Sequence, residues 1–424
     1  MTDLNRAMQL HLEGKYADSE ALYRQLLEAH PDPAKIMQCL GFLLQQTGRL
    51  EEALEFIEAS LAIDAAHAEW HYNHGIVLEK LGRSEDAAKA FSRSLSLNRN
   101  NYFCWTNLGA VLEKGGAFEQ AEQAYREAVM LNPQCMDAYY LLASLFASQG
   151  RFIEAKHFNS QGIIYDPVEN KSKIKLGLAL YETGRQDDAI RLMKSWCDTE
   201  PGNPVALHML AAFRETNAPE RCTAQYVETT FDNFAHDFES VLSRLDYAGP
   251  RLLKEALGRL GFQKSSLKVL DLGCGTGLNG PVLKPISKIL TGVDLSSAML
   301  GKAQDKNCYD FFFKSEICEF LDRESARFDL ITCIDTLIYF GNLEAVFRKT
   351  HARLEKGGSF IFTTETGSDG FDLDVTGRYR HAENYVTGLL EQAGFPPPSI
   401  EDAVIRRESA RPVYGQLFIA SKIH

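Results

Sequence analysis

Residues 269–277 read VLDLGCGTG, and this stretch decides the fold of the second half of the chain. The apolar residues around Asp271 predict the end of a buried parallel strand. Gly273, Gly275 and Gly277 follow at once. Glycine tolerates positive φ and lets the backbone approach a ligand with no Cβ in the way. An apolar, helix-like stretch begins at Leu278. The order of strand, glycine loop and helix marks the place where open α/β sheets bind nucleotide-like ligands.

Two ligand classes compete for this loop, beside the third alternative of a purely structural glycine turn. Residues 275–280 also spell GxGxxG, the dinucleotide fingerprint, which is weak evidence when it stands alone. Asp271 lies two residues before the first glycine, where its carboxylate suits an ammonium group of the ligand. An NAD enzyme needs a separate catalytic half, and too little chain remains for one.

The nine-residue stretch resembles the first motif of the class I S-adenosylmethionine (SAM)-dependent methyltransferases, and the resemblance extends from Tyr226 to the C-terminus. It implies a Rossmann-like α/β domain with a mostly parallel, seven-stranded sheet closed by an antiparallel strand. It also implies SAM as cofactor. The motif positions that the resemblance assigns to the cofactor are Asp271, Gly273, Cys274, Gly275 and Gly277.

The predicted second strand, 289–295, ends in another acid, Asp294, which lies 23 residues after Asp271. An acid at this strand end accepts hydrogen bonds from both ribose hydroxyls. The resemblance gives Asp294 that role and assigns Leu295 and Met299 to the adenine. A short strand is expected over 311–313. The resemblance then places Glu316 and Ile317 in the cofactor site, although a helix N-terminal acid facing the dipole is the alternative for Glu316.

The predicted fourth strand, 328–335, leads into residues that match the family pattern DxLxYxGxL. The carboxyl end of such a strand, beside the ligand crevice, is the usual place for substrate and base groups. Asp335 and Tyr339 are therefore candidate catalytic residues. The matching positions are Asp335, Leu337, Tyr339, Gly341 and Leu343.

His381 is the first candidate for a general base. It belongs to a GRxxHxxxY pattern that resembles one in methyltransferases linked to tetratricopeptide repeats. A helix is expected to begin near His381, so that His381 and Tyr385, four residues apart, share a face. A structural histidine at a helix start is the equally open alternative. A polar loop over 366–380 is expected to shape the substrate pocket. Arg406 and Arg407 suit a substrate anion, with surface charge as the alternative.

The segment before the predicted domain carries aromatic residues at helical spacing. It reads FDNFAHDF from Phe231 and is similar to an FDxxAxxFD-like lid segment of related methyltransferases. A lid excludes water and holds reactants together. We therefore expect Tyr226, Phe231 and Phe234 at the cofactor, beside the alternative of an amphipathic helix that only packs on the domain.

The first half of the chain is a repeat. Glycines recur every 34 residues, with small residues and then aromatic or aliphatic residues in the same phase. The period resembles the tetratricopeptide (TPR) repeat. Each unit is two helices joined by a glycine turn, and neighbouring units stack to bury their apolar faces. The glycines are Gly14, Gly48, Gly82, Gly116, Gly150 and Gly184.

Three domains follow from this pattern. Residues 1–217 form a TPR solenoid of six repeats and a capping helix, 218–249 a connector with the lid helix, and 250–424 the methyltransferase domain. The solenoid offers a concave surface for a protein partner, or it serves as a scaffold or dimerisation arm. Homo-oligomerisation stays open. Asn73, Asn107 and Trp105 are candidates for the groove, with solvated surface as the alternative.

Charge and composition restrict the partners. The net charge is −12, and residues up to 217 carry 21 Lys and Arg against 29 Asp and Glu. An acidic chain argues against nucleic acid, whose phosphates need a basic surface. No apolar run is long enough for a membrane span, and no secretory leader is visible. The nine cysteines form no CxxC pair, so no metal site is predicted and a reducing cytoplasm is expected.

Three functions remain open on these observations. The first is methyl transfer from SAM to a small-molecule or carrier-bound acceptor. The second is a protein methyltransferase whose solenoid docks its target. The third is a non-catalytic assembly protein with a vestigial cofactor site.

Overall fold

The computed structural model describes residues 3–28, 33–167, 171–214, 218–262, 266–408 and 411–423. The chain divides into two compact units, Met1–Lys171 and Ser172–His424. The domain boundaries expected at 217 and 249 stay predictions, and 217 itself lies outside the described residues. None of the described helices has the length and apolar character that crossing a membrane requires.

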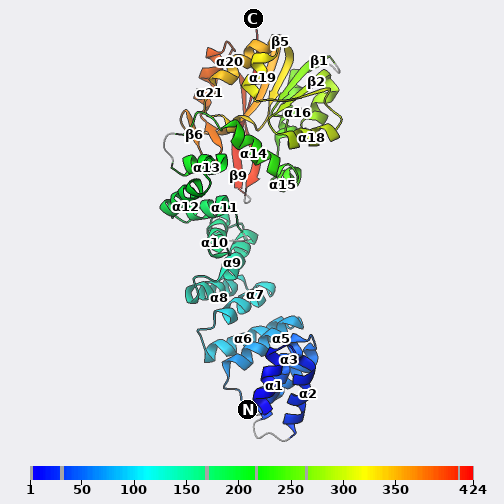
Figure 1. Ribbon diagram of the computed structural model, residues 1–424, viewed down its shortest axis with the longest axis vertical. Coiled ribbons are helices and arrows are strands. Elements are labelled where there is room, and N and C mark those ends of the chain that lie inside the picture. The colour runs from blue at the N-terminus through cyan, green and yellow to red at the C-terminus, as the bar shows by residue number, and fades with distance from the viewer. Residues whose placement is uncertain are drawn as a thin grey trace. The chain divides into compact units, whose positions relative to one another are not determined.

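The first unit consists of antiparallel helix pairs (Figure 1). The TPR solenoid expected from the sequence is confirmed, with one pair in each 34-residue period. Its helices are α1 (Asp3–Leu12), α2 (Tyr16–Leu27), α3 (Pro33–Gln46), α4 (Leu50–Ile63), α5 (Ala68–Lys80), α6 (Ser84–Leu97), α7 (Tyr102–Lys114), α8 (Phe118–Leu131), α9 (Met136–Ser148) and α10 (Phe152–Tyr165). The second unit begins with α11 (Lys173–Glu182), α12 (Gln186–Thr199) and α13 (Pro204–Arg214), which keep the same phase.

Glycine explains the period in two ways. The turn glycine after each first helix has positive φ, for example 82° at Gly48 and 79° at Gly116, a conformation that L side chains rarely adopt. The second glycine lies within the first helix and lets the second helix approach. A Cβ added to Gly109 would lie 2.5 Å from the ring of Tyr125. The small and aromatic positions of the repeat therefore pack directly against each other.

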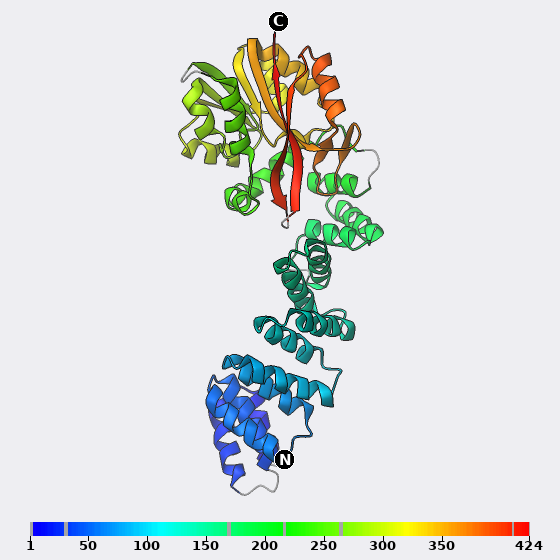
Figure 2. The ribbon, with the colours of Figure 1, turned by 180° about the vertical axis from the view of Figure 1, so that it is seen from behind.

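The second unit carries the α/β domain (Figure 1). Its parallel strands run in the order β3-β2-β1-β4-β5, and β9 pairs antiparallel with β5, from Ser359↔Ser421 to Glu365↔Gly415. Figure 2 shows the long β8–β9 hairpin crossing in front of the other strands. The strands are β1 (Leu267–Leu272), β2 (Ser287–Asp294), β3 (Phe311–Lys314), β4 (Phe328–Cys333), β5 (Leu354–Thr366), β6 (Phe371–Leu373), β7 (Tyr379–His381), β8 (Ser399–Glu408) and β9 (Arg411–Ser421).

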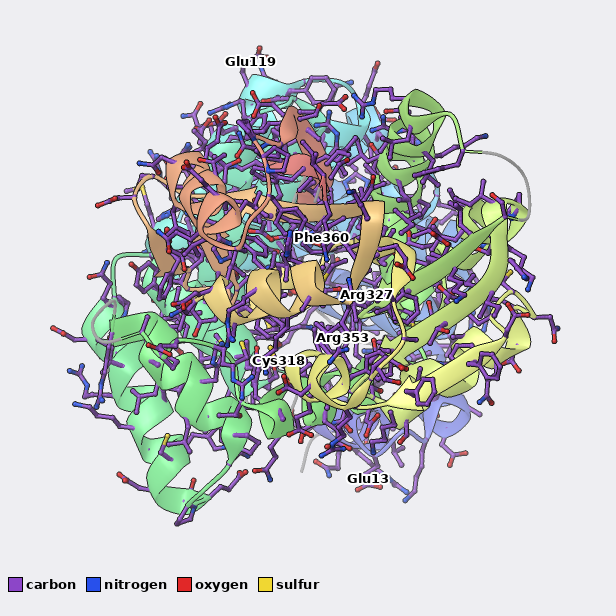
Figure 3. The ribbon with its side chains drawn as sticks, turned by 90° about the horizontal axis from the view of Figure 1, so that it is seen from above. Glu13, Glu119, Cys318, Arg327, Arg353 and Phe360 are labelled. Carbon is purple, nitrogen blue, oxygen red and sulfur yellow. The ribbon has the colours of Figure 1, made fainter. Side chains whose placement is uncertain are left out.

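Both faces of this sheet are covered, because alternate strand residues point to opposite sides. Leu270 and Leu272 of β1 belong to one core, with α19 (Ile317–Arg323), α20 (Glu344–Arg353) and α21 (Glu383–Gln392). Val269 belongs to the other, with α16 (Gly249–Leu260) and α17 (Gly280–Leu283). Figure 3 labels Arg353 of α20, whose Nε donates to the Leu321 carbonyl of α19 at 2.8 Å.

The fold class expected from the sequence is confirmed, with differences in detail. Within the described residues the sheet has nine strands, because the predicted loop 366–380 contains the β6–β7 hairpin. The hairpin attaches to the end of β5, where Thr366 pairs with His381. The predicted lid helix is broken into α14 (Ala224–Phe234) and α15 (Phe238–Arg244). His381 lies on β7, two residues before α21, and not on a helix.

Candidate functional site

The glycine loop follows the carboxyl end of β1 and lines the central cavity of the domain. All three of its glycines have positive φ, at 69° for Gly273, 54° for Gly275 and 78° for Gly277. A Cβ on Gly273 would collide with Thr336, whereas a Cβ on Gly275 would meet no protein atom within 4 Å. Gly273 is thus needed for close packing, and the backbone at Gly275 faces open space that a ligand can fill.

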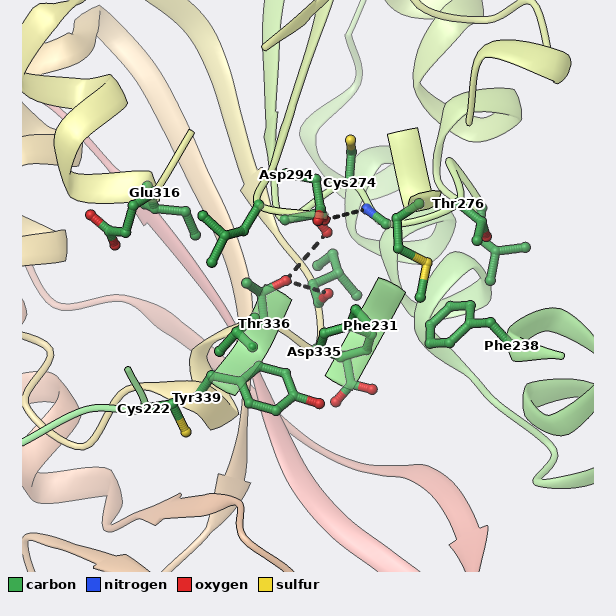
Figure 4. Close-up of a pocket in the computed structure, with 18 of the residues that line it drawn as sticks. Cys222, Phe231, Phe238, Cys274, Thr276, Asp294, Glu316, Asp335, Thr336 and Tyr339 are labelled. Carbon is green, nitrogen blue, oxygen red and sulfur yellow. Dashed lines mark hydrogen bonds between the residues drawn. The ribbon is translucent and has the colours of Figure 1, made fainter. Parts of the chain in front are cut away.

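The cavity lies at the carboxyl ends of β1, β2 and β4 and is covered by α14 and α15 (Figure 4). It encloses about 1000 Å³, its open mouth included. Ligand pockets commonly combine apolar walls with a few polar groups. Its lining residues from the glycine loop and strand ends are Gly273, Cys274, Gly275, Thr276, Leu278, Asn279, Asp294, Leu295, Met299, Ser315, Glu316, Ile317, Ile334, Asp335, Thr336, Tyr339 and Phe340. The residues from the covering segments are Arg221, Cys222, Ala224, Val227, Phe231, Phe238, Leu242 and Tyr247.

Asp294 ends β2 with its carboxylate held by the backbone. One oxygen accepts from Gly275 N–H and the other from Ser296 N–H, each at 2.9 Å. Burial raises the pKa of the Asp294 carboxyl, although these backbone donors oppose the shift. The arrangement fixes a carboxylate at the cavity wall, with lone pairs free to accept from a ligand hydroxyl.

The covering helices are tied to the sheet domain by polar contacts. The Asp232 carboxylate of α14 accepts from the Ser296 hydroxyl and from Ala298 N–H in the first turn of α18 (Ser297–Asp305). Glu228 of α14 lies 2.7 Å from Lys314, and Glu239 of α15 lies 2.8 Å from Lys306. These contacts close one side of the cavity over Asp294.

Asp335 faces the cavity from a strained position. Its φ is +55°, and its N–H donates to Thr363 Oγ1 at 2.8 Å. Arg406, only 2% exposed, holds the carboxylate at 3.1 Å. Burial raises the pKa of Asp335 to about 6, against the opposing charge of Arg406. Arg406 also pairs with Glu365 and Glu408, so its guanidinium is fully engaged within the protein.

Two phenols share this end of the cavity. Figure 4 shows Tyr339 beside Asp335, with its ring perpendicular to that of Phe231 at a centroid distance of 5.3 Å. Burial raises the pKa of both Tyr339 and Tyr247, and the charge of Asp335 adds to the shift in each. Both hydroxyls therefore stay protonated at neutral pH and can donate or accept a hydrogen bond.

Comparison with known proteins agrees with this geometry. Residues 243–397 match a methyltransferase domain model, and residues 10–74, 72–134 and 106–160 match tetratricopeptide repeat models. A ubiquinone biosynthesis O-methyltransferase of Paracidovorax citrulli is 30% identical over 170 residues, which are 38% of this chain and 68% of that protein. The chain belongs to the class I methyltransferases. It also carries tetratricopeptide repeats.

Further relatives align over shorter spans. A ubiquinone biosynthesis O-methyltransferase of Coxiella burnetii is 30% identical over 99 residues, and the chain spans 42% of that protein's length. Among solved structures, a crystal structure of MamA aligns at 20% identity and a TM-score of 0.37, covering 39% of this chain and 97% of that one. A structure of Pseudomonas aeruginosa pilF aligns at 18% identity and a TM-score of 0.37, covering 49% and 95%.

Most of the residues that the sequence assigned to cofactor or catalysis meet at this one cavity of the methyltransferase. Five do not line it. The residues that it brings together are Phe231, Gly273, Cys274, Gly275, Asp294, Leu295, Met299, Glu316, Ile317, Asp335 and Tyr339. The residues outside the lining are Tyr226, Phe234, Asp271, Gly277 and His381.

Asp271 is fully buried behind the glycine loop. Its two oxygens accept from the Tyr309 hydroxyl at 2.6 Å and the Thr332 hydroxyl at 2.7 Å. Burial raises the pKa of Asp271 to about 6, with both hydroxyls opposing the shift. The sequence placed this carboxylate at a ligand ammonium group, whereas in the structure it fastens β1 to β4 and to Tyr309.

His381 is also fully buried, on the far side of the turn after Tyr339. Its Nε2–H donates to the carbonyls of Phe340 at 2.7 Å and Gly341 at 3.2 Å. Burial lowers the pKa of His381 to about 4. Its ring stacks on Tyr385 at 6.1 Å, so the expected pairing occurs although His381 is on a strand. This environment holds the turn rather than presenting a base to the cavity.

Glu316 lines the cavity and also caps α19. One oxygen caps α19 by accepting from Glu319 N–H at 3.0 Å, and the other lies 3.4 Å from Arg221 at the cavity.

The lid residues differ among themselves. Tyr226 points away from the cavity toward His208, at a ring distance of 4.1 Å, while Phe234 packs on Phe238 at 5.6 Å.

Sequence reasoning missed several residues of the methyltransferase site. Phe238 belongs to the aromatic spacing that predicted the lid, so its place at the cavity could have been predicted. Asp232 follows Phe231 in the lid segment, but its bond to Ser296 depends on tertiary contact. Tyr247 and Arg221 carried no signal, because neither belongs to a motif. The expected anion partner Arg406 is engaged by three carboxylates, and Arg407 is exposed.

Proposed function

We propose that the chain transfers a methyl group from SAM to a small-molecule or carrier-bound acceptor that bears a neutral nucleophile. The observation that carries this proposal is the joint position of Gly275 and Asp294 at one cavity. A backbone free of Cβ faces open space there, and a half-buried carboxylate that suits ribose hydroxyls stands 2.9 Å from its N–H.

An unpaired group of the lining supports a polar ligand at this place. Asn279 Oδ1 is buried with no hydrogen-bond partner in the described protein. Leu295, Met299 and Ile317 offer an apolar slot beside Asp294 for a flat base. We assign the adenine to that slot, with Glu316 at its edge, and the methionine part to Gly273, Cys274 and Gly275. Gly277 maintains the conformation of the glycine loop, and Phe231 of the lid covers the cavity.

The charges of the cavity argue for a cationic donor and a neutral acceptor. Among the described lining residues the only cation is Arg221, against the carboxylates of Asp294, Glu316 and Asp335. A sulfonium and an ammonium group are favoured beside such walls. An anionic acceptor would find no unpaired guanidinium among the described lining residues, because Arg221 lies 3.4 Å from Glu316.

The mechanism needs little acid–base chemistry from the protein. When bound, SAM would supply a methyl group already activated by its sulfonium, whose sulfur would keep the electron pair of the broken carbon–sulfur bond. Asp335, whose pKa lies near 6, takes the acceptor proton. Tyr339 orients the acceptor, and α14 with α15 excludes water. We assign His381 a structural role.

Calorimetric titration of the full chain with SAM tests the proposal. We expect binding heat with the native protein. Asp294→Ala removes hydrogen bonds to a charged acceptor and should weaken the affinity about 10- to 100-fold, and Asp294→Asn should fall between the two. Native protein that gives no heat would support the vestigial site and end the enzyme proposal.

A second candidate, methylation of a docked protein, is favoured by a hollow in the first unit. The hollow is lined by α1, α2, α3 and α5, with aromatic side chains on α2, α3 and α5, and it includes Asn73, as expected from the sequence. Asn107 and Trp105 instead bond within the unit, to Tyr72 and to the Arg99 carbonyl. The lining residues are Met8, His11, Leu12, Tyr16, Tyr23, Lys35, Gln38, Cys39, Phe42, Gln46, Glu69, Trp70 and Asn73.

Incubation of the full chain with methyl-labelled SAM and an extract of its source cells separates the two candidates. Label that enters the small-molecule fraction supports the first, and label that enters protein supports the second. If Trp70→Ala abolishes labelling of protein while SAM still binds, the hollow is the docking site for the target protein. Unchanged labelling of protein by this variant would remove that role.

A further inference from the structure

Helix α13 brings His208 to the outer side of the cavity wall. The imidazole is buried, at 6% exposure, and lies 2.9 Å from the Gly377 carbonyl. Because a carbonyl oxygen only accepts, Nε2 carries the proton and donates it. Burial lowers the pKa of His208, which keeps the ring neutral. α13 keeps the phase of the helical repeat and precedes residues 243–397, which match the methyltransferase domain.

A single layer of side chains separates His208 from the cavity. Cys222 Sγ lies 3.5 Å from Nε2, and Cys222 itself lines the cavity. The Tyr226 ring lies against the imidazole at 4.1 Å, and the next residue, Val227, is again part of the lining. Cys222 N–H also donates to the Tyr339 carbonyl at 2.9 Å. The lid and the turn with the proposed acceptor residues therefore rest on this histidine.

A second, charged route leads from the same histidine to Asp335. The carbonyl that it holds belongs to Gly377, and the next residue, Arg378, pairs with Glu408 at 2.6 Å. Arg406 binds the same carboxylate at 2.8 Å and Asp335 at 3.1 Å. Gly377, where this route begins, packs tightly against Tyr226, because a Cβ on Gly377 would lie only 3.1 Å from the Tyr226 hydroxyl.

We propose that His208 is a positioning residue of the methyl-donor site, through which the last helix of the repeat sets the lid α14 and the place of Asp335. The inference rests on the proposed function, since it concerns the same cavity. It implies that a histidine outside the methyltransferase domain proper contributes to donor affinity without touching the donor.

Three variants of the full chain test this role by calorimetric titration with SAM. His208→Ala leaves the Gly377 carbonyl buried without a donor and should raise the Kd about tenfold. His208→Gln restores an N–H donor and should recover most of the affinity. His71→Ala is the matched control, because His71 is a similarly buried histidine, with Nε2 3.0 Å from the Ala65 carbonyl in the first unit. It should leave the Kd unchanged.

The outcomes separate the inference from the function on which it rests. A folded His208→Ala protein with native affinity overturns the inference alone, whereas native protein that binds no SAM overturns both. Should His208→Ala fail to fold, hydrogen exchange of the native chain decides. Saturating SAM should slow amide exchange in α13 and at Arg378 but not in α5. Unchanged exchange in α13 would overturn the inference.

Discussion

The contact between the lid and α18 gives the sharpest prediction. Replacing Asp232 by Ala removes the acceptor for the Ser296 hydroxyl and for Ala298 N–H. Each hydrogen bond to a charged group contributes roughly 1.5–3 kcal/mol where it is sheltered, and the exposed side of Asp232 reduces that figure toward about 1 kcal/mol for each bond. With two bonds, about 2 kcal/mol of lid closure is lost, which corresponds to about a 30-fold weaker affinity for SAM.

The assay is the dissociation rate of SAM in stopped flow, combined with equilibrium titration. A lid contact slows escape, so most of the change should appear in the dissociation rate. Asp237→Ala is the control, because Asp237 is an exposed acid between α14 and α15 that bonds only to exposed His236 among the described side chains. It should leave both quantities within about twofold of the native values.

A double-mutant cycle then isolates the contact. If Asp232 acts through Ser296, the variant Ser296→Ala should lose part of the same affinity, and the double variant should lose less than the sum. Equal behaviour of Asp232→Ala and Asp237→Ala would refute the lid contact. Strict additivity with Ser296→Ala would show that Asp232 acts by another route.

Three further predictions concern stability and are followed by differential scanning calorimetry. Arg406→Met removes a buried guanidinium from buried Glu365 and from half-buried Asp335 and Glu408, although Arg378 stays beside Glu365 and Glu408. It should destabilise the second unit by about 3 kcal/mol, the low end for a broken buried pair, whereas exposed Arg407→Met should cost under about 0.5 kcal/mol; equal losses would contradict the cluster. Native Asp271 keeps its proton up to about pH 6, while the unfolded chain ionises near its ordinary pKa of 3.8, so the native protein loses roughly 3 kcal/mol relative to Asp271→Asn as the pH rises from about 4 to 7. A pH-independent difference between the two would contradict the raised pKa. Gly109→Ala places a Cβ 2.5 Å from the ring of Tyr125 and should destabilise the first unit by about 1–3 kcal/mol, and a neutral effect would contradict the close helix contact.

The fold was largely predictable because its signals are local. The 34-residue phase of Gly48 and its equivalents reflects turns that need positive φ, and the stretch around Asp271 combines strand periodicity with a glycine loop. The strand expected to end around Asp271 is β1, Leu267–Leu272. The β6–β7 hairpin escaped prediction because its strands are only three residues long and are formed by pairing with the end of β5.

The site was predictable where motif and ligand geometry coincide, as at Gly275 and Asp294. It was less so where tertiary packing decides the direction of a side chain. His381 and Tyr226 belong to good patterns, yet both rings are buried against other elements. Tyr247 reaches the site by packing alone, so spacing in the sequence carried no sign of its role. Asp232 belongs to the lid segment, but its bond to Ser296 is a tertiary contact that spacing does not reveal.

A crystal structure of the full chain with S-adenosylhomocysteine would show whether the cavity beside Asp294 binds the cofactor. We predict that the ribose hydroxyls lie within hydrogen-bond distance of the Asp294 carboxylate, the adenine beside Met299 and Ile317, and the thioether sulfur facing Asp335 beneath Phe231. A nucleoside bound elsewhere, or in this cavity with its ribose away from Asp294, would contradict it.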